Sequence, residues 1–248
     1  MLADDGEIDF PNPAQAPEDE DLVALSGIDN LGHVLYAQTP VDWPKLTYFG
    51  SNWDPSTLLA GYARGLFPMP YELDDDSEAI GWWSPARRAI FIPNEIKISR
   101  SLKKSMNGYT VTVDKQFRDV VTACGDPARP QGWINSSVID AFTRLHELGH
   151  AHSIEVINSR GQLVGGLYGV EIGGVFAGES MFHHERDASK VALVHLGHIM
   201  RRSPGRIIDT QWMTEHLRSL GAQEVSRADY CQLVQTKLGM DSAFNIIG

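Results

Sequence analysis

The spacing of apolar residues changes along the chain between the period of a helix and that of a strand. Apolar positions recur every three or four residues in several stretches, which predicts helices over 54–68, 97–106, 115–125, 136–148, 187–202, 213–221 and 226–239. Alternating or short continuous apolar runs predict strands over 89–93, 108–114, 152–158 and 205–211, and two more within 161–182. This order indicates an α/β (α+β) fold with a mixed central sheet flanked by helices.

A change in composition near Trp83 divides the chain into parts. Acidic residues and prolines dominate its start, which predicts a flexible acidic tail over residues 1–30. A small N-terminal domain is expected over 31–83, with an acidic loop over 71–81 leading to its end. The remaining residues, 84–248, are expected to form the larger domain.

Length and composition exclude several classes of protein. The chain has 248 residues and a hydrophobic fraction of 42%, enough for a sizeable core. No apolar run is long enough to cross a bilayer, and the first residues do not resemble a signal peptide, so a cytoplasmic protein without membrane contact is expected. Cys124 and Cys231 lie far apart and outside any CxxC spacing, which supports neither a disulfide framework nor a cysteine zinc site.

The stretch "RLHELGHAHSIEV" contains His-Glu-x-x-His, a spacing that holds zinc in metalloproteases when both histidines lie on one helix. Gly149 argues against such a helix, because glycine after a leucine commonly ends a helix in the left-handed conformation. His150 would then lie outside the helix that carries His146 and Glu147, and a strand would follow. The sequence therefore predicts a helix end and no metal site.

The net charge of −11 speaks against broad, non-specific binding of nucleic acid, yet the charge is unevenly distributed. Much of the acidity lies in the first residues, whereas the stretch "KISRSLKKS" is basic. Most such runs are merely solvated helix faces, but its cationic residues are candidates for binding phosphate groups: Lys97, Arg100, Lys103 and Lys104. Trp83 and Trp133 lie near basic segments, as aromatic residues do where single-stranded RNA ends stack, but tryptophans are more often core residues.

Four polar residues interrupt apolar stretches that otherwise read as buried strands. Glu179 and Ser180 follow Gly178, where a ligand can approach the backbone closely. Asp209 and Gln211 are two positions apart and share one face of a predicted strand. A carboxylate beside a carboxamide can orient and deprotonate an amine, although a structural polar pair at a strand end would look the same.

Taken in order, many short motifs resemble those of the bacterial leucyl/phenylalanyl-tRNA-protein transferase family. The resemblance runs from about Asn52 to Tyr230 and includes the motifs "WWSP", "ISRS", "HELGHAHSIEV", "LVGGLYGV", "FAGESMF", "IDTQ" and "HLRSLGA". It implies a GNAT-like acyltransferase domain without a cofactor. It also implies transfer of Leu or Phe, and less well Met, from aminoacyl-tRNA to an N-terminal Arg or Lys, which marks the acceptor protein for degradation.

The resemblance also assigns roles to particular residues. Asp209 and Gln211 correspond to the proposed catalytic pair, and the aminoacyl-adenosine pocket corresponds to Trp83, Trp133, Leu167, Tyr168, Phe176, Glu179 and Ser180. Three positions depart from the family pattern: Met69 stands where a tryptophan is usual, and His183 with His184 replaces small or basic residues. The departure at Met69 puts stacking on the terminal adenosine at that position in doubt.

The mechanism implied is a simple aminolysis. The aminoacyl ester is already activated, and an α-amine with a pKa of about 7.7–8 is partly neutral in the cytoplasm, so Asp209 need only accept a proton while Gln211 orients the amine. Two alternatives remain open: an acetyl-CoA-dependent GNAT enzyme, and an adaptor that reads N-terminal residues without chemistry. A monomer is expected.

Overall fold

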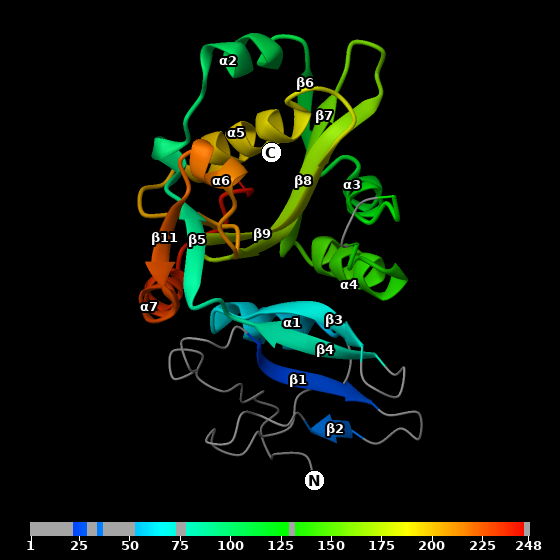
Figure 1. Cartoon of the computed structure of the whole chain (residues 1–248), viewed down its shortest axis with the longest axis vertical. Coiled ribbons are helices and arrows are strands. Elements are labelled where there is room, and N and C mark those ends of the chain that lie inside the picture. Colours follow the sequence, from blue (N-terminus) through cyan, green and yellow to red (C-terminus); the bar gives the residue numbers. More distant parts are fainter. Residues whose placement is uncertain (1–21, 29–33, 37–52, 73–77, 129–131, 246–248) are drawn as a thin grey trace. The chain divides into compact units, whose positions relative to one another are not determined.

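The computed structural model in Figure 1 describes most of the chain, namely residues 22–28, 34–36, 53–72, 78–128 and 132–245. The chain divides into two compact units, and each is described separately. The first unit comprises Met1–Ala86 with Ser226–Gln235, and the second comprises Arg87–Val225 with Thr236–Gly248.

The first unit contains a four-stranded antiparallel sheet with the strand order β2-β1-β4-β3. Its strands are β1 (Leu22–Ile28), β2 (Val34–Tyr36), β3 (Phe67–Glu72) and β4 (Glu78–Trp83). Helix α1 (Pro55–Ala63) starts with Pro55 in the first turn, where its missing N–H costs nothing. A side chain at Gly61 would clash with the ring of the buried Trp82, so glycine lets the helix approach this ring closely.

Two expectations for this part of the chain were wrong in part. The tail predicted over 1–30 extends too far, because Leu22–Ile28 form β1 and pair with β4; residues 1–21 lie outside the described part. The acidic loop predicted over 71–81 overlaps two paired strands, since β3 and β4 stay in register from Phe67 opposite Trp83 to Glu72 opposite Glu78. Backbone ladder bonds formed here despite an acidic composition that disfavours strands.

Helix α7 (Arg227–Lys237) comes late in the sequence but belongs mainly to the first unit. The backbone N–H of Arg227 donates to the Ala86 carbonyl at 3.0 Å, and its Nε donates to the Ser84 carbonyl at 2.6 Å. Further along the helix, Gln235 Nε2 donates to the Ala63 carbonyl at 2.8 Å. The range 84–248 expected for the larger domain therefore includes a segment that packs with the smaller one.

The second unit is built on a seven-stranded mixed sheet with the order β11-β5-β10-β9-β8-β7-β6. The strands are β5 (Arg87–Phe91), β6 (Thr110–Val113), β7 (Ala151–Ile157), β8 (Leu163–Ile172), β9 (Val175–His183), β10 (Ile207–Asp209) and β11 (Gln223–Ser226). All pairs with a known register are antiparallel except β9 with β10, which are parallel and joined through a helix. The predicted mixed α/β architecture is confirmed, although the short edge strand β11 was not foreseen.

Helices cover both faces of this sheet (Figure 1). One face packs against α3 (Phe117–Cys124) and α4 (Ser136–Glu147), and the other packs against α5 (Ala188–Met200). Helix α5 is apolar almost all round, which is typical of a fully enclosed helix, and each buried Leu, Ile or Val contributes about 1.5–3 kcal/mol. The shorter helices are α2 (Arg100–Met106) and α6 (Glu215–Ser219).

The His-Glu-x-x-His stretch has the predicted structure. Helix α4 ends at Glu147 with Leu148 as its C-cap, and Gly149 has a φ of 79°. His150 therefore lies between α4 and β7. His146 stacks on Phe117 with ring centroids 4.3 Å apart, and its Nδ1 is 2.8 Å from the Ala151 carbonyl oxygen. Both histidines are thus part of a helix end.

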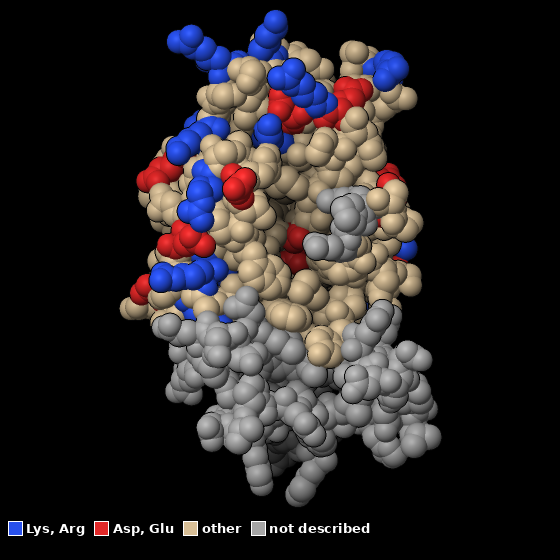
Figure 2. All heavy atoms as spheres, in the orientation of Figure 1, with Lys and Arg blue, Asp and Glu red and all other residues tan. Residues whose placement is uncertain are grey.

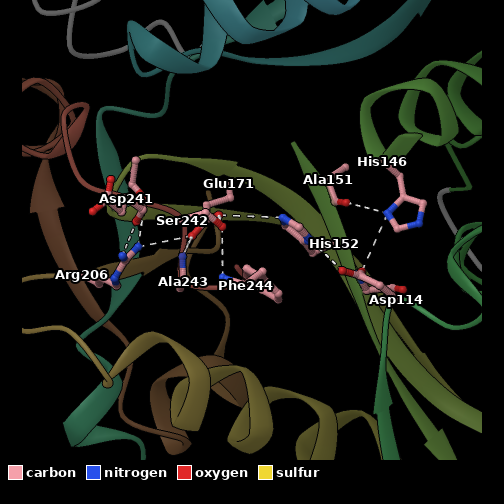
Figure 3. A network of polar contacts seen from close by, with 12 residues as sticks. Asp114, His146, Ala151, His152, Glu171, Arg206, Asp241, Ser242, Ala243 and Phe244 are labelled. Carbon is pink, nitrogen blue, oxygen red and sulfur yellow. Dashed lines mark hydrogen bonds and ion pairs between the residues drawn. The ribbon is translucent and has the colours of Figure 1, made fainter. Parts of the chain in front are cut away.

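A buried polar network anchors the last described residues to the sheet (Figure 3). Glu171 on β8 accepts the backbone N–H of Ala243 at 2.7 Å, and Arg206 is 3.3 Å from the same carboxylate. On the neighbouring strand β7, His152 stacks on Phe244 with ring centroids 3.9 Å apart, and its Nδ1 is 2.7 Å from Asp114 Oδ2. This network places the end of the chain under the sheet, on the face that carries α5.

Candidate active site

The site forms where strands β9 and β10 separate. Strand β10 pairs with β9 from Ile207 opposite Val175 to Asp209 opposite Ala177 and then ends, whereas β9 continues to His183 alongside β8. The side chains beyond Ala177 therefore face a gap in the sheet. A crevice at the end of a strand, next to a neighbour that stops, is a common place for ligands in α/β proteins.

A cavity of about 250 Å³ occupies this gap. Most of its wall is apolar, with a few polar groups at one end. The lining residues are Leu167, Gly178, Glu179, Ser180, Met181, Leu193, Leu196, Ile208, Thr210, Gln211, Thr214, His216 and Leu217. A hollow is visible on the face shown in Figure 2, with a mostly uncharged wall and an acidic patch in its floor. Such a mixture suits a ligand with one apolar group and one polar reacting centre.

A β-bulge brings Glu179 to the cavity. The register between β8 and β9 shifts from Tyr168 opposite Ser180 to Gly169 opposite Gly178, which leaves Glu179 as the extra residue on β9. Bulges bend a strand and redirect the side chain of the extra residue. Glu179 is consequently one of the few polar residues that line a mostly apolar cavity.

Asp209 is fully buried and bound by a buried arginine. Arg88 on β5 donates from Nε to Asp209 Oδ1 at 2.8 Å and from Nη2 to Oδ2 at 2.7 Å, and both side chains are at most 1% exposed. The backbone N–H of Gln211 also donates to Asp209 Oδ1, at 3.0 Å. The Asp209 carboxylate thus holds the backbone of Gln211 in place, and it is not among the groups that line the cavity.

Gln211 has an unusual backbone conformation and a donor without a partner. Its φ is 57°, in the left-handed region, and its carbonyl oxygen accepts the N–H of Ala89 at 2.9 Å. The side chain is 8% exposed and lines the cavity, and within the described part of the chain its Nε2 has no hydrogen-bond partner. A strained residue with an unpaired buried donor is typical of a functional position.

His216, on α6, contributes a titratable group at the rim of the cavity. Partial burial lowers its pKa below the usual 6.5, and electrostatic interactions with Lys190 and His183 lower it further. These causes favour the neutral imidazole, which can both accept and donate a hydrogen bond.

The structure brings some of the sequence-predicted residues together and leaves others apart. Leu167, Glu179, Ser180 and Gln211 line the cavity. Tyr168 lies on the opposite face of the sheet, where its ring packs edge-on against those of Phe142 and Phe117 at 5.4 and 6.0 Å. Phe176 is buried in the core against Phe244, and Trp133 is half-buried in the segment before α4. Trp83 lies on β4 in the first unit.

Most of the apolar lining was not predicted. Leu193 and Leu196 come from α5, Ile208 from β10 and Leu217 from α6. Apolar residues on these elements carry no signal that separates a cavity wall from ordinary core. The role of the buried Arg88 was not predicted, since a cation next to a strand gives no indication of its partner 121 positions later.

The predicted tRNA-contacting residues lie outside the cavity. Arg100, Lys103 and Lys104 are exposed on α2, and Lys97 is exposed in the segment that precedes it. Figure 2 shows Lys and Arg side chains gathered over the end of the unit that carries α2. Among the described residues, no three His, Cys, Asp or Glu side chains are grouped as metal ligands, and no helix is both long and apolar enough to span a membrane.

Comparison with known proteins identifies the family. The sequence pattern described as "Leucyl/phenylalanyl-tRNA protein transferase" matches residues 90–235, and that of the corresponding N-terminal domain matches residues 52–86. The chain is 42% identical to the leucyl/phenylalanyl-tRNA–protein transferase of Aromatoleum aromaticum over 91% of this chain and 85% of that protein. It is 44% identical to the one of Photobacterium profundum over 79% of this chain and 82% of that protein.

Solved structures show weaker similarity. L-PGS from Bacillus licheniformis has a TM-score of 0.41 and 11% identity, over 63% of this chain and 66% of that one. A tandem GNAT protein from the clavulanic acid biosynthesis pathway has a TM-score of 0.35 and 11% identity, over 73% and 61%. The sequence matches cover both units and include the residues around the cavity, and this chain therefore belongs to the leucyl/phenylalanyl-tRNA protein transferase family.

Proposed function

We propose that the protein transfers Leu, Phe and, less well, Met from aminoacyl-tRNA to the N-terminal Arg or Lys of acceptor proteins, which marks them for degradation. Family membership supports the aminoacyl-tRNA donor and the protein acceptor. The observation that carries the proposal is the mostly apolar cavity lined by Gln211, whose buried Nε2 has no hydrogen-bond partner among the described residues. The reaction as proposed requires no cofactor.

The cavity suits an unbranched or aromatic side chain next to an ester. Leu167, Leu193, Leu196 and Ile208 form an apolar wall, and Met181 adds a flexible side chain that can repack around ligands of different shape. A slot of this kind accepts Leu, Phe and Met, whereas branching next to the reacting carbon would bring methyl groups against the polar end. Discrimination of this type rests on pocket shape and is worth about 1–3 kcal/mol per methylene group.

Gln211 is placed to stabilise the reacting carbonyl group. When the acceptor amine attacks the ester carbonyl carbon, negative charge develops on the carbonyl oxygen, and the Gln211 Nε2 can donate a hydrogen bond to it. The bond from this carbon to the ribose oxygen then breaks, and the proton lost by the amine balances the one gained by that oxygen. A positioned donor of this kind acts on the transition state, where charge is largest.

Asp209 acts in this proposal as a positioning residue. Both of its oxygens accept from Arg88, and Oδ1 also accepts from the Gln211 backbone. Its role as proton acceptor, which the sequence suggested, is therefore less well supported than a role in holding Gln211. Glu179, whose carboxylate lines the cavity, provides negative charge for the cationic Arg or Lys of the acceptor.

The direct test is a transfer assay with purified protein. Leu-tRNA and a peptide that begins with Arg should yield a Leu-Arg peptide without added metal or coenzyme A. Acetyl-CoA replaces Leu-tRNA in a parallel reaction, and binding of the Arg peptide is measured without any donor. Acetylation would support the GNAT alternative, binding without product would support the adaptor, and inhibition by chelators would favour a metal mechanism.

The basic helix α2 is proposed to bind the donor tRNA through Lys103 and Lys104, together with Arg100 and the preceding Lys97. The double substitution Lys103→Glu and Lys104→Glu should weaken tRNA binding and lower its salt dependence by about 0.7–0.9 in log–log slope for each lost phosphate contact. Binding is measured by titration at several salt concentrations, with Lys115→Glu as an exposed control. Parallel slopes for the wild type and the double variant would exclude α2 as the contact.

We also propose that the protein is a cytoplasmic monomer that does not bind membranes. Sedimentation of the purified full chain, alone and with vesicles of anionic phospholipid, tests both statements. A mass of twice the chain, or cosedimentation with the vesicles, would contradict them.

A further inference from the structure

A second cavity lies next to the first, at the C-terminal end of helix α6. Its volume is about 300 Å³, and its wall carries mainly ammonium and hydroxyl groups. The lining residues are Lys97, Ile98, Ser99, Ser101, Leu102, Asp187, Lys190, Ser219 and Leu220. His216 and Leu217 of α6 line the first cavity, whereas Ser219 and Leu220 at its end line the second. Both cavities therefore touch the same short helix.

The charges in the second cavity favour a singly charged anion. Lys190 Nζ is 2.9 Å from Asp187 Oδ1, and this hydrogen bond, ahead of other causes, lowers the pKa of Asp187 below its usual range. Asp187 Oδ2 also accepts from Ser105 Oγ at 2.9 Å, so the carboxylate is occupied by donors from two helices. Lys97 has no ion pair within the described part of the chain. Two ammonium groups and one carboxylate leave a single positive charge.

The positive charge of Lys190 also acts on a residue that lines the first cavity. It is one of the causes that lower the pKa of His216, after burial of the imidazole. Since His216 lines the first cavity and Lys190 lines the second, the positive charge of Lys190 lies near both cavities. A ligand that fills both would place its apolar part in the first cavity and its anionic part in the second.

We infer that the second cavity binds a backbone phosphodiester of the single-stranded 3′ end of the donor tRNA, while the aminoacyl group occupies the first cavity. This inference rests on the proposed function. Ser219 follows Leu217 by two positions on α6, a rise of about 3 Å along the helix, so the two cavities lie close enough for adjoining groups of one ligand. A phosphodiester carries one negative charge and accepts hydrogen bonds from the ammonium and hydroxyl groups that line the cavity.

This subsite differs from the exposed lysines of α2 itself, and Lys97, which precedes that helix, belongs to the subsite. Lys103 and Lys104 do not line the second cavity, and they are exposed on the helix. They would meet the double-stranded part of the tRNA, which short donors lack. The two sets of lysines can therefore be separated by the length of the donor.

The test uses three leucylated donors in the transfer assay: leucyl-adenosine, a leucylated dinucleotide with one phosphodiester, and leucyl-tRNA. The variant Lys97→Gln with Lys190→Gln should raise KM for the dinucleotide by about tenfold, the scale of one lost charge-assisted contact. The KM for leucyl-adenosine and the kcat for both donors should change less than twofold. Lys115→Gln, an exposed lysine outside the cavity, serves as the matched control.

A second variant changes the charge in the opposite direction. Asp187→Asn removes the carboxylate, and asparagine tolerates the left-handed φ of 61° at this position. It should lower KM for the dinucleotide and leave KM for leucyl-adenosine unchanged. This variant keeps the inference testable if the double lysine variant does not fold.

The outcomes distinguish the inference from the proposed function. Equal changes in KM for leucyl-adenosine and the dinucleotide, or changes for leucyl-tRNA alone, would overturn the subsite. Inorganic phosphate is titrated as a competitor: if the lysine variants alter its inhibition but not the dinucleotide KM, the cavity binds a free anion and the inference is wrong. Absence of transfer by the wild type with every donor would instead contradict the proposed function.

Discussion

Gln211→Glu should lower the kcat of leucyl transfer by about 10²–10³, the usual cost of removing a hydrogen-bond donor to a developing oxyanion. The substitution keeps the size of the side chain but replaces the Nε2 donor with a carboxylate oxygen that can only accept. In the structure Gln211 lines the cavity, and its Nε2 is buried and has no partner within the described residues. The measurement is steady-state transfer from Leu-tRNA to an Arg-peptide.

Two further variants separate the loss of the Nε2 hydrogen-bond donor from any change in the backbone conformation at Gln211. Gln211→Asn keeps a carboxamide and suits the left-handed φ of 57°, but its donor is withdrawn by one methylene, so an intermediate loss is expected. Gln211→Ala removes the donor altogether and should resemble Gln211→Glu. Activity of Gln211→Glu equal to or above that of the wild type would show that this position accepts a proton, and the donor role would be wrong.

Arg88→Ala should lower the free energy of unfolding by about 3–5 kcal/mol, because it leaves the buried Asp209 carboxylate without its cation. The pair is at most 1% exposed and makes two hydrogen bonds of 2.8 and 2.7 Å. The matched control is Arg118→Ala, which breaks a bond of the same length to Asp140 between side chains that are 58% and 67% exposed. Exposed pairs contribute about 0–1 kcal/mol.

Urea denaturation followed by tryptophan fluorescence measures both variants. If Arg88→Ala lowered the free energy of unfolding by less than about 1 kcal/mol, the buried pair of Arg88 and Asp209 would stabilise the protein no more than an exposed pair does. Steady-state transfer by Asp209→Asn tests the positioning role of Asp209, since the loss of charge should loosen the Gln211 backbone and lower kcat without changing KM for the tRNA. An unchanged kcat would remove Asp209 from the mechanism.

Much of the fold is present in local sequence patterns. The helices and strands of the second unit follow from apolar periodicity, and the end of α4 at Gly149 follows from the conformational freedom of glycine. The paired strands β3 and β4 were missed over 71–81, because ladder bonds between backbones can form under acidic side chains that discourage a strand. Strand β11 was missed because a short edge strand carries little apolar pattern.

The sequence by itself determined the family and the mixed α/β architecture, and it marked Glu179, Ser180, Asp209 and Gln211 as candidates. Only the tertiary structure decided which of these residues line the cavity and which are buried beside it. Arg88 and Asp209 meet because β5 and β10 are neighbours in the sheet, and the cavity exists because β10 stops at Asp209 while β9 continues. The lysine-lined second cavity likewise joins residues from α5, α6 and the segment before α2. Contacts between segments so distant in sequence depend on strand order and register, which local patterns of hydrophobicity and charge do not encode.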